Sequence, residues 1–438
     1  MSWRNITRTP SRGRQSPLTG SEAWLREKVS RQVAPSVPSA SRADLQKAGE
    51  AEARFRKSGS MLALKEAYAA WERILQHPDF AAAELEFRLA ALGYVGVLCL
   101  LRYSIKGEIQ DLDRAIQVLE EAIRLAPQDS RLRPRLLNNL DDALNQRYVH
   151  KGDLRDLEWA IQIHAEILEL MPGDSAGRPH FLYSAGRALA LRYSHTSDLQ
   201  DLERAIAMFE EALRLTPQDS PDRLDFLYNL GIHLSQLYAP TSDLGHLECA
   251  IRMFKEALQL TPGGSPDRPR SLNSLAGGLS QLFAHTGNLQ YLEQAIEMYE
   301  EAIQLTPQDS PNRARLLNNL GNTLSQRFAQ TRNLRDLERA ILAYKDAVQL
   351  TPQDSPDSPL RLSNLGHGLR LRYTVTNDFQ DLGQAIQAFE EAVLLTPRDP
   401  LDRPRFFNNL GAALTDRYWR TNDLRDLERS IWAFERAV

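Results

Sequence analysis

The sequence predicts an all-α fold, a right-handed superhelical solenoid of antiparallel helix pairs. Two observations carry this prediction: a small residue followed by isoleucine recurs every 45 residues, and a proline recurs at the same interval. A fixed period of this length is typical of a repeat array that grows by stacking, so no single globular core is needed. The small residues of the recurring dipeptide are Ala115, Ala160, Ala205, Ala250, Ala295, Ala340, Ala385 and Ser430.

The first helix of each repeat is clearest between Asp198 and Thr216. Asp198 is a candidate N-cap, and Asp201 stands three residues further on, as in a capping box. Apolar residues follow at steps of three and four, which places them on one face of a helix. Thr216 and Pro217 end the helix, because the residue before a proline is displaced from the α region.

The second helix of the same repeat begins at Ser220-Pro221-Asp222. Serine suits the N-cap, proline the first helical position and an acid the first turn. The apolar stripe of this helix runs to Tyr238, and a short turn leads to the next repeat. Each repeat is therefore predicted to be two antiparallel helices of roughly sixteen residues, each about 25 Å long.

We divide the chain into three parts. Residues 1–42 form a basic tail rich in Ser, Pro and Arg, which buries too little apolar surface to become ordered. An ordinary solvated tail is favoured over a mitochondrial transit peptide. Residues 43–106 are expected to form a helical N-terminal cap with a degenerate first repeat. Residues 107–438 form the array of 45-residue repeats, the last of which is incomplete.

Charge and cysteine content disfavour several kinds of protein. The tail carries eight Lys or Arg and two acids, which gives it a net charge of +6. Since the whole chain has a net charge of −4, the rest of the chain carries −10. This negative charge on the repeats argues against binding to the phosphate backbone of nucleic acid. Cys99 and Cys249 cannot form a disulfide framework, and no apolar stretch suits a signal peptide or a membrane span. We therefore expect a cytoplasmic protein that uses no cofactor or metal and contacts neither nucleic acid nor membrane.

The spacing inside the repeat resembles the tetratricopeptide repeat. HEAT and armadillo repeats have a similar period, but their internal pattern differs. The resemblance covers roughly residues 62–438, with about eleven residues beyond the family's 34-residue pattern placed in the loops. The first helix matches the family's A, F, A and P with Ala205, Phe209, Ala212 and Pro217. The second helix matches its W, L, G and Y with Leu227, Leu230, Gly231 and Leu234.

This resemblance implies a non-catalytic protein–protein interaction scaffold. Arrays of the family bind a peptide or protein segment in a concave groove lined by the second helix of each repeat, here the Asn-Leu-Gly helix. Asparagine suits this task because its carboxamide offers a donor and an acceptor to an extended backbone. Alternatively, an asparagine bonds only to the neighbouring helix. The predicted partner-binding residues are Asn138, Asn139, Arg187, Asn229, Asn273, Asn318, Asn319, Asn322, Asn364, His367, Asn408 and Asn409.

Two other functions remain open from the sequence. The extended repeat is similar to fungal and bacterial arrays linked to CHAT or NACHT domains, which implies the sensing or regulatory arm of a larger effector. An enzyme is the third possibility, because Asp141 and His164 break the repeat pattern together and could serve acid–base chemistry. No nucleophile or metal motif accompanies them, so a non-enzyme is favoured. Arginines such as Arg192 are expected to pair with acids such as Asp201.

Overall fold

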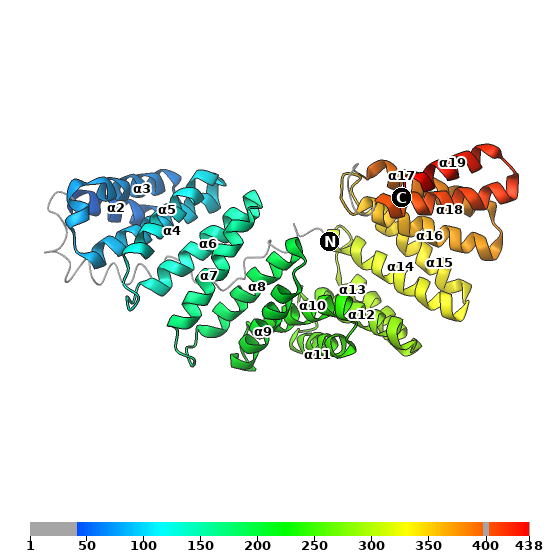
Figure 1. Cartoon of the computed structure of the whole chain (residues 1–438), viewed down its shortest axis with the longest axis horizontal. Coiled ribbons are helices and arrows are strands. Elements are labelled where there is room, and N and C mark those ends of the chain that lie inside the picture. The colour runs from blue at the N-terminus through cyan, green and yellow to red at the C-terminus, as the bar shows by residue number, and fades with distance from the viewer. Residues whose placement is uncertain (1–41, 397–402, 438) are drawn as a thin grey trace. The chain divides into compact units, whose positions relative to one another are not determined.

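The computed structural model describes residues 42–396 and 403–437, so the predicted tail lies outside it except for Arg42. These ranges hold α-helices, one 3-10 helix and no strand, which confirms the all-α prediction (Figure 1). No helix among them is long and apolar enough to cross a bilayer.

The helices follow one another in tandem along the chain. Their bounds are α2 (Arg42–Ser58), α3 (Met61–Gln76), η3 (Pro78–Ala82), α4 (Leu85–Lys106), α5 (Ile109–Leu125), α6 (Arg133–Lys151), α7 (Leu154–Leu170), α8 (Arg178–Thr196), α9 (Leu199–Leu215), α10 (Arg223–Thr241), α11 (Leu244–Leu260), α12 (Arg268–Thr286), α13 (Leu289–Leu305), α14 (Pro311–Thr331), α15 (Leu334–Gln349), α16 (Ser358–Thr376), α17 (Phe379–Leu395), α18 (Arg403–Thr421) and α19 (Leu424–Glu435).

The chain divides into two compact units, and the division falls inside α10, between Phe226 and Leu227. We call the described residues up to Phe226 the first unit and those from Leu227 the second unit. Within each unit, an even-numbered helix packs against the odd-numbered helix that follows it. The domain boundaries predicted at residues 42 and 106 stay predictions.

Aspartate or asparagine caps begin the odd-numbered helices from α7 to α19, as the sequence predicts. The Oδ1 atom of Asp198 accepts a hydrogen bond of 3.0 Å from the backbone N–H of Gln200. The predicted capping box is wrong, however, because the carboxylate of Asp201 accepts a hydrogen bond of 2.6 Å from Nε of Arg192. An arginine near the end of the preceding helix α8 therefore outcompetes the local N–H group. The same type of cap is formed by Asp153, Asp243, Asn288, Asn333, Asp378 and Asp423.

The even-numbered helices begin in two ways. α14 starts at Pro311 with Ser310 as N-cap, which is the pattern predicted for α10. α10 itself starts at Arg223, two residues later than predicted.

The side chain of Arg223 links two successive helices. Its guanidinium reaches back to the carbonyl oxygens of Leu213 and Thr216, 3.5 Å and 3.3 Å away at the end of α9. These carbonyls lie at the end of the helix, where the regular hydrogen bonds between successive turns stop, so the arginine serves as a C-cap supplied by the next helix. The same contact is made by Arg133, Arg178, Arg268 and Arg313.

Glycines and alanines let neighbouring helices approach closely, as predicted. A Cβ atom added to Gly231 would lie 2.5 Å from the ring of Phe254, and one added to Gly366 would lie 2.7 Å from the ring of Phe389. Each aromatic ring therefore fills the space that a glycine of the preceding even-numbered helix leaves open. Ala205 is wholly buried in the same way.

Candidate partner-binding surface

All the predicted site residues lie on even-numbered helices. The first unit holds three of them, on α6 and α8: Asn138, Asn139 and Arg187. The second unit holds the other nine, on α10, α12, α14, α16 and α18: Asn229, Asn273, Asn318, Asn319, Asn322, Asn364, His367, Asn408 and Asn409.

Several asparagines of the second unit bond to the neighbouring even-numbered helix, which is the alternative that the sequence left open. The hydrogen bonds run from Asn319 Nδ2 to Asn273 Oδ1 at 3.0 Å, from Asn364 Nδ2 to Asn318 Oδ1 at 2.9 Å and from Asn409 Nδ2 to Ser363 Oγ at 3.0 Å. They connect α12 to α14, α14 to α16 and α16 to α18. Since a carboxamide has two donors and an acceptor with two lone pairs, each pair holds the helices together and keeps further capacity for hydrogen bonding.

The predicted site residues differ in their access to solvent. Arg187, Asn322, His367 and Asn408 are exposed, whereas Asn139 and Asn318 are buried. The remaining asparagines are half-buried. Because a partner must reach the side chain that binds it, the exposed residues are the better candidates for direct contact.

Two of the exposed residues have defined surroundings. Asn322 Oδ1 accepts a hydrogen bond of 2.9 Å from Tyr344 Oη, which orients the carboxamide. Desolvation by the surrounding protein and the positive charge of Arg370 hold the pKa of His367 below its usual range. His367 is therefore neutral at pH 7 and offers one ring nitrogen as donor and the other as acceptor.

The sequence did not single out Tyr228 and Ser274, which extend the same row of side chains. Ser274 Oγ donates a hydrogen bond of 3.1 Å to Tyr228 Oη, and the guanidinium of Arg270 lies 3.6 Å from the centre of the Tyr228 ring. Tyr228 and Ser274 stand 46 residues apart, the same separation as the paired asparagines. That constant offset is the signal from which they could have been found.

The arginines at the ends of the even-numbered helices pair with buried carboxylates. Arg192 makes two hydrogen bonds to Asp201, and Arg327 makes two to Asp336, as predicted. These hydrogen bonds raise the pKa of both arginines. Their guanidinium groups therefore serve to join helices rather than to attract a ligand. Equivalent pairs are Arg147–Asp156, Arg372–Asp381 and Arg417–Asp426.

Asp141 and His164 face one another in the interior of the first unit. His164 Nε2 lies 3.2 Å from Asp141 Oδ2, and the two residues are only 1% and 6% exposed. Asp141 Oδ1 accepts a hydrogen bond of 2.8 Å from Asn145 Nδ2. A catalytic pair has to touch its substrate, and burial leaves these two groups almost no contact with solvent. The geometry therefore favours a packing role over the proposed acid–base role.

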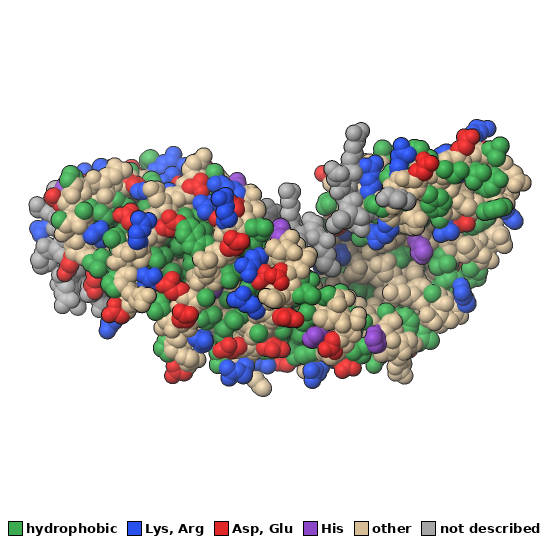
Figure 2. All heavy atoms as spheres, in the orientation of Figure 1, with side chains coloured by type: hydrophobic (Ala, Val, Ile, Leu, Met, Phe, Trp, Pro, Cys, Tyr) green, Lys and Arg blue, Asp and Glu red, His purple; other side chains and the backbone are tan. Residues whose placement is uncertain are grey.

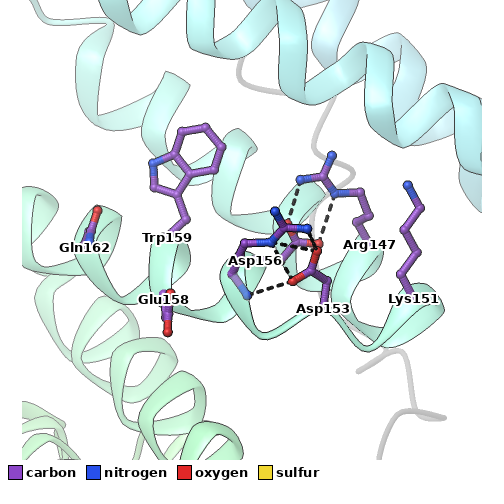
Figure 3. Close-up of a pocket in the computed structure, with 8 residues that line it drawn as sticks. Arg147, Lys151, Asp153, Asp156, Glu158, Trp159 and Gln162 are labelled. Atoms are coloured by element: carbon purple, nitrogen blue, oxygen red, sulfur yellow. Dashed lines mark hydrogen bonds and ion pairs between the residues drawn. The ribbon is translucent and has the colours of Figure 1, made fainter.

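A surface pocket of about 570 Å³ lies in the first unit, between α6 and α7 (Figure 3). It is lined by Arg147, Lys151, Asp153, Arg155, Asp156, Glu158, Trp159 and Gln162. Neither Asp141 nor His164 lines it, nor does any predicted partner-binding residue.

The cations of this pocket are already paired. Arg155 lies 2.6 Å from Asp153, Arg147 bonds to Asp156, and Lys151 lies 3.2 Å from Asp113. Among the described residues, no group of His, Cys, Asp and Glu is placed to hold a metal ion. The pocket therefore gives no specific indication of a ligand.

Comparison with known proteins identifies repeats in four segments. One tetratricopeptide repeat model matches residues 270–312 and 313–357, and a second matches residues 104–129 and 197–219. No curated protein matches the chain.

Solved structures that resemble the chain include tetratricopeptide repeat proteins. One from Parabacteroides merdae is 16% identical, with 75% of this chain and 99% of that chain covered and a TM-score of 0.45. Part of another from Cytophaga hutchinsonii is 14% identical, with coverage of 69% and 99% and a TM-score of 0.43. BtubC from P. vanneervenii is 23% identical, with coverage of 54% and 90% and a TM-score of 0.40.

Proposed function

We propose that this chain, which contains tetratricopeptide repeats, is a non-catalytic scaffold that holds a segment of a partner protein on its even-numbered helices. The observation that carries the proposal is the row of exposed polar side chains on three successive even-numbered helices of the second unit. Asn322 lies on α14, His367 on α16 and Asn408 on α18.

The chemistry of this row suits a polypeptide ligand. Carboxamide and neutral imidazole groups can pair with both the N–H and the C=O groups of an extended backbone, whatever its side chains are. The hydrogen bonds between asparagines of neighbouring helices support the proposal, because they fix the spacing of the row before a partner arrives. A preformed surface loses less conformational freedom on binding.

Photo-crosslinking from inside the row tests this proposal. A photoreactive amino acid replaces Asn322 in the full chain, and a control chain carries it at Leu342, which is 62% exposed on α15. We expect a specific protein to be crosslinked from position 322 and not from position 342. Equal crosslinking patterns from both positions would contradict the proposal.

The sequence also suggested the regulatory arm of a CHAT-type or NACHT-type effector. That alternative depends on the resemblance of the repeats and stays a prediction. Sequencing of the full transcript tests it, because an effector arm requires such a domain to be encoded on the same message.

A further inference from the structure

The two helix layers of the second unit carry opposite charge. The even-numbered helices α12, α14, α16 and α18 contain twelve arginines and a single carboxylate, Asp416. The odd-numbered helices α11, α13, α15 and α17 contain twelve carboxylates against five Lys or Arg. In the space-filling view, red atoms are scarce over α14 and α16 (Figure 2).

Most of the twelve arginines have a structural partner. Arg327, Arg372 and Arg417 bond to aspartates of the following helix, and Arg268 bonds to Glu301. The single carboxylate of the layer, Asp416, is itself held by Arg370 at 2.6 Å. Within their bounds the even-numbered helices therefore carry almost no negative charge, and Asp267 and Asp357 stand just outside them as the N-cap residues of α12 and α16.

Three of the twelve arginines stand at equivalent places in the repeat, within the first five residues of their helices. Arg270 is stacked on the Tyr228 ring, Arg315 contacts Asn312 Oδ1 at 3.3 Å, and Arg405 lies over the Phe406 ring at 5.2 Å. Stacking on a ring leaves the N–H groups at the edge of a guanidinium able to donate.

These arginines share a helix face with the row of asparagines. Arg315 precedes Asn318 by three residues and Asn322 by seven, and residues at these separations lie on one side of an α-helix. Arg405 precedes Asn408 in the same way. The hydrogen bonds between α12, α14, α16 and α18 place these faces side by side. We call this surface, with Arg270, Arg315, Asn322, His367, Arg405 and Asn408, the basic face.

We propose that the basic face binds an extended, acidic segment inside a partner chain, an inference that rests on the scaffold function proposed above. Arginine grips a carboxylate through two parallel N–H···O bonds, and the neighbouring asparagines bond to the peptide backbone. The occupant is an acidic polypeptide because the face combines an excess of positive charge with amide groups that match a peptide backbone.

The spacing of the helices sets the spacing of the acids. Neighbouring packed helices lie about 8–10 Å apart, and an extended chain advances about 3.3 Å per residue, so one helix corresponds to about three residues. Arg270 and Arg315 lie on successive even-numbered helices, Leu360 takes the equivalent place on α16, and Arg405 follows on α18. The expected segment therefore has an acid, a second acid three residues on, an apolar residue after three more and a third acid after another three.

Fluorescence anisotropy with the full chain tests this proposal. The probe is a labelled, amidated peptide with glutamates and one leucine at these intervals and serine between them, and its comparison peptide has glutamine for glutamate. A second pair of peptides carries the same residues in reverse order, so that binding in both chain directions is tested. We expect the glutamate peptide to bind on the order of tenfold tighter in one direction. Binding should weaken as salt rises, because exposed charges are screened.

Two matched variants locate the binding. Arg270, Arg315 and Arg405 are changed together to glutamine, and a control carries Arg155→Gln, Arg335→Gln and Arg425→Gln, which are exposed elsewhere. Both variants lose three positive charges, so only the place of the charge differs. We expect on the order of tenfold weaker binding in the first variant and wild-type binding in the control. Circular dichroism verifies that both retain the helical fold.

Three outcomes would overturn the proposal. They are equal affinity for the glutamate and glutamine peptides, equal losses in the two variants, or a single-stranded oligonucleotide of equal charge that binds as tightly at the same arginines. A requirement for a free C-terminal carboxylate would also contradict an internal segment. If the peptides fail while a protein is still crosslinked from position 322, the scaffold function stands and only the acidic partner is wrong.

Discussion

Asp141 with His164 in the first unit and Gly366 with Phe389 in the second unit occupy equivalent places in the repeat. The second pair is apolar, with the ring of Phe389 packed over the glycine so closely that a Cβ atom would lie 2.7 Å from it. The first pair fills the same space with a carboxylate and an imidazole that are 3.2 Å apart. The repeat therefore requires a matched contact between two helices at this place, and either kind of contact satisfies it.

The arginine–aspartate contact varies in the same paired way. Arg192 and Asp201 bond in the first unit, but 45 residues further on the equivalent residues are Leu237 and His246. At the next repeat they are Leu282 and Tyr291. Leu237 and Leu282 are buried, so an apolar side chain fills the place of the guanidinium where the aspartate is missing. Since an unpaired buried charge is costly, the two partners change together.

Replacing the Asp141–His164 contact with a glycine–phenylalanine contact like that of Gly366 and Phe389 gives the largest expected effects on stability. His164→Phe alone leaves Asp141 without its imidazole partner beside a ring, and we expect a loss of about 3–5 kcal/mol in stability. Asp141→Gly added to His164→Phe rebuilds the glycine–aromatic contact, so the double variant should be at least as stable as wild type. Urea unfolding measures the stability, and hydrogen exchange in α6 and α7 localises the change. A double variant as unstable as the single one would refute the equivalence of the two contacts.

Removal of the two partners of an arginine–aspartate pair should have unequal effects. Arg327→Leu leaves the carboxylate of Asp336 buried without a cation, which we expect to cost about 2–3 kcal/mol. Asp336→Asn retains an acceptor oxygen and leaves a guanidinium that reaches water, because the side chain of Arg327 is 20% exposed. The expected cost is about 1 kcal/mol. Thermal or urea unfolding of both variants compares them, and equal losses would contradict this asymmetry.

The asparagines of the second unit should divide into structural and exposed residues. Asn364→Ala removes the hydrogen bond to Asn318, which is 8% exposed, at an expected cost of about 1 kcal/mol. Asn408 is exposed, so Asn408→Ala should change the free energy of unfolding by less than about 0.5 kcal/mol. Chemical denaturation distinguishes these values. If Asn408→Ala costs as much as Asn364→Ala, the row cannot be divided in this way.

One cysteine lies in each unit, so labelling of the two thiols compares the units. This comparison needs no substitution and has the smallest expected effect. Burial raises the pKa of Cys99 in the first unit to about 12, whereas Cys249 in the second unit is only half-buried. At pH 8 we expect a disulfide reagent to label Cys249 in the native protein and Cys99 only after unfolding. The unfolded chain loses the Cys99 proton near its ordinary pKa, so the stability of the first unit should fall as pH rises above about 9. Rapid labelling of both thiols in the native protein would contradict the burial of Cys99.

The sequence predicted the contacts that repeat within one helix pair. Asp198 as an N-cap, the bond between Arg192 and Asp201, and Phe209 beside small residues all follow from local spacing. Asp141 and His164 were recognised only as a break in the pattern. They stand 23 residues apart, as Gly231 and Phe254 do, and that spacing identifies them as partners.

Contacts between successive even-numbered helices were not predictable in the same way. The hydrogen bond between Asn318 and Asn364 depends on how far one helix is shifted along its neighbour, which the period of the sequence does not determine. Exposure of Asn322 and burial of Asn318 likewise depend on the rotation of α14 about its axis. The sequence therefore indicated the row of asparagines as a whole, but not which of them join helices and which are exposed to solvent.

The arginine that caps the preceding helix also bears on the order in which the chain folds during synthesis. Arg313 bonds to carbonyls only seven and ten residues behind it, at Thr306 and Ile303. On the ribosome, that loop can therefore close as soon as the first turn of α14 emerges, before any later helix exists. Contacts of such short range form quickly, because little chain entropy is lost in closing the loop. Where serine replaces the arginine, Ser358 Oγ donates to the carbonyl of Pro352 at 2.7 Å, so this junction too is closed locally.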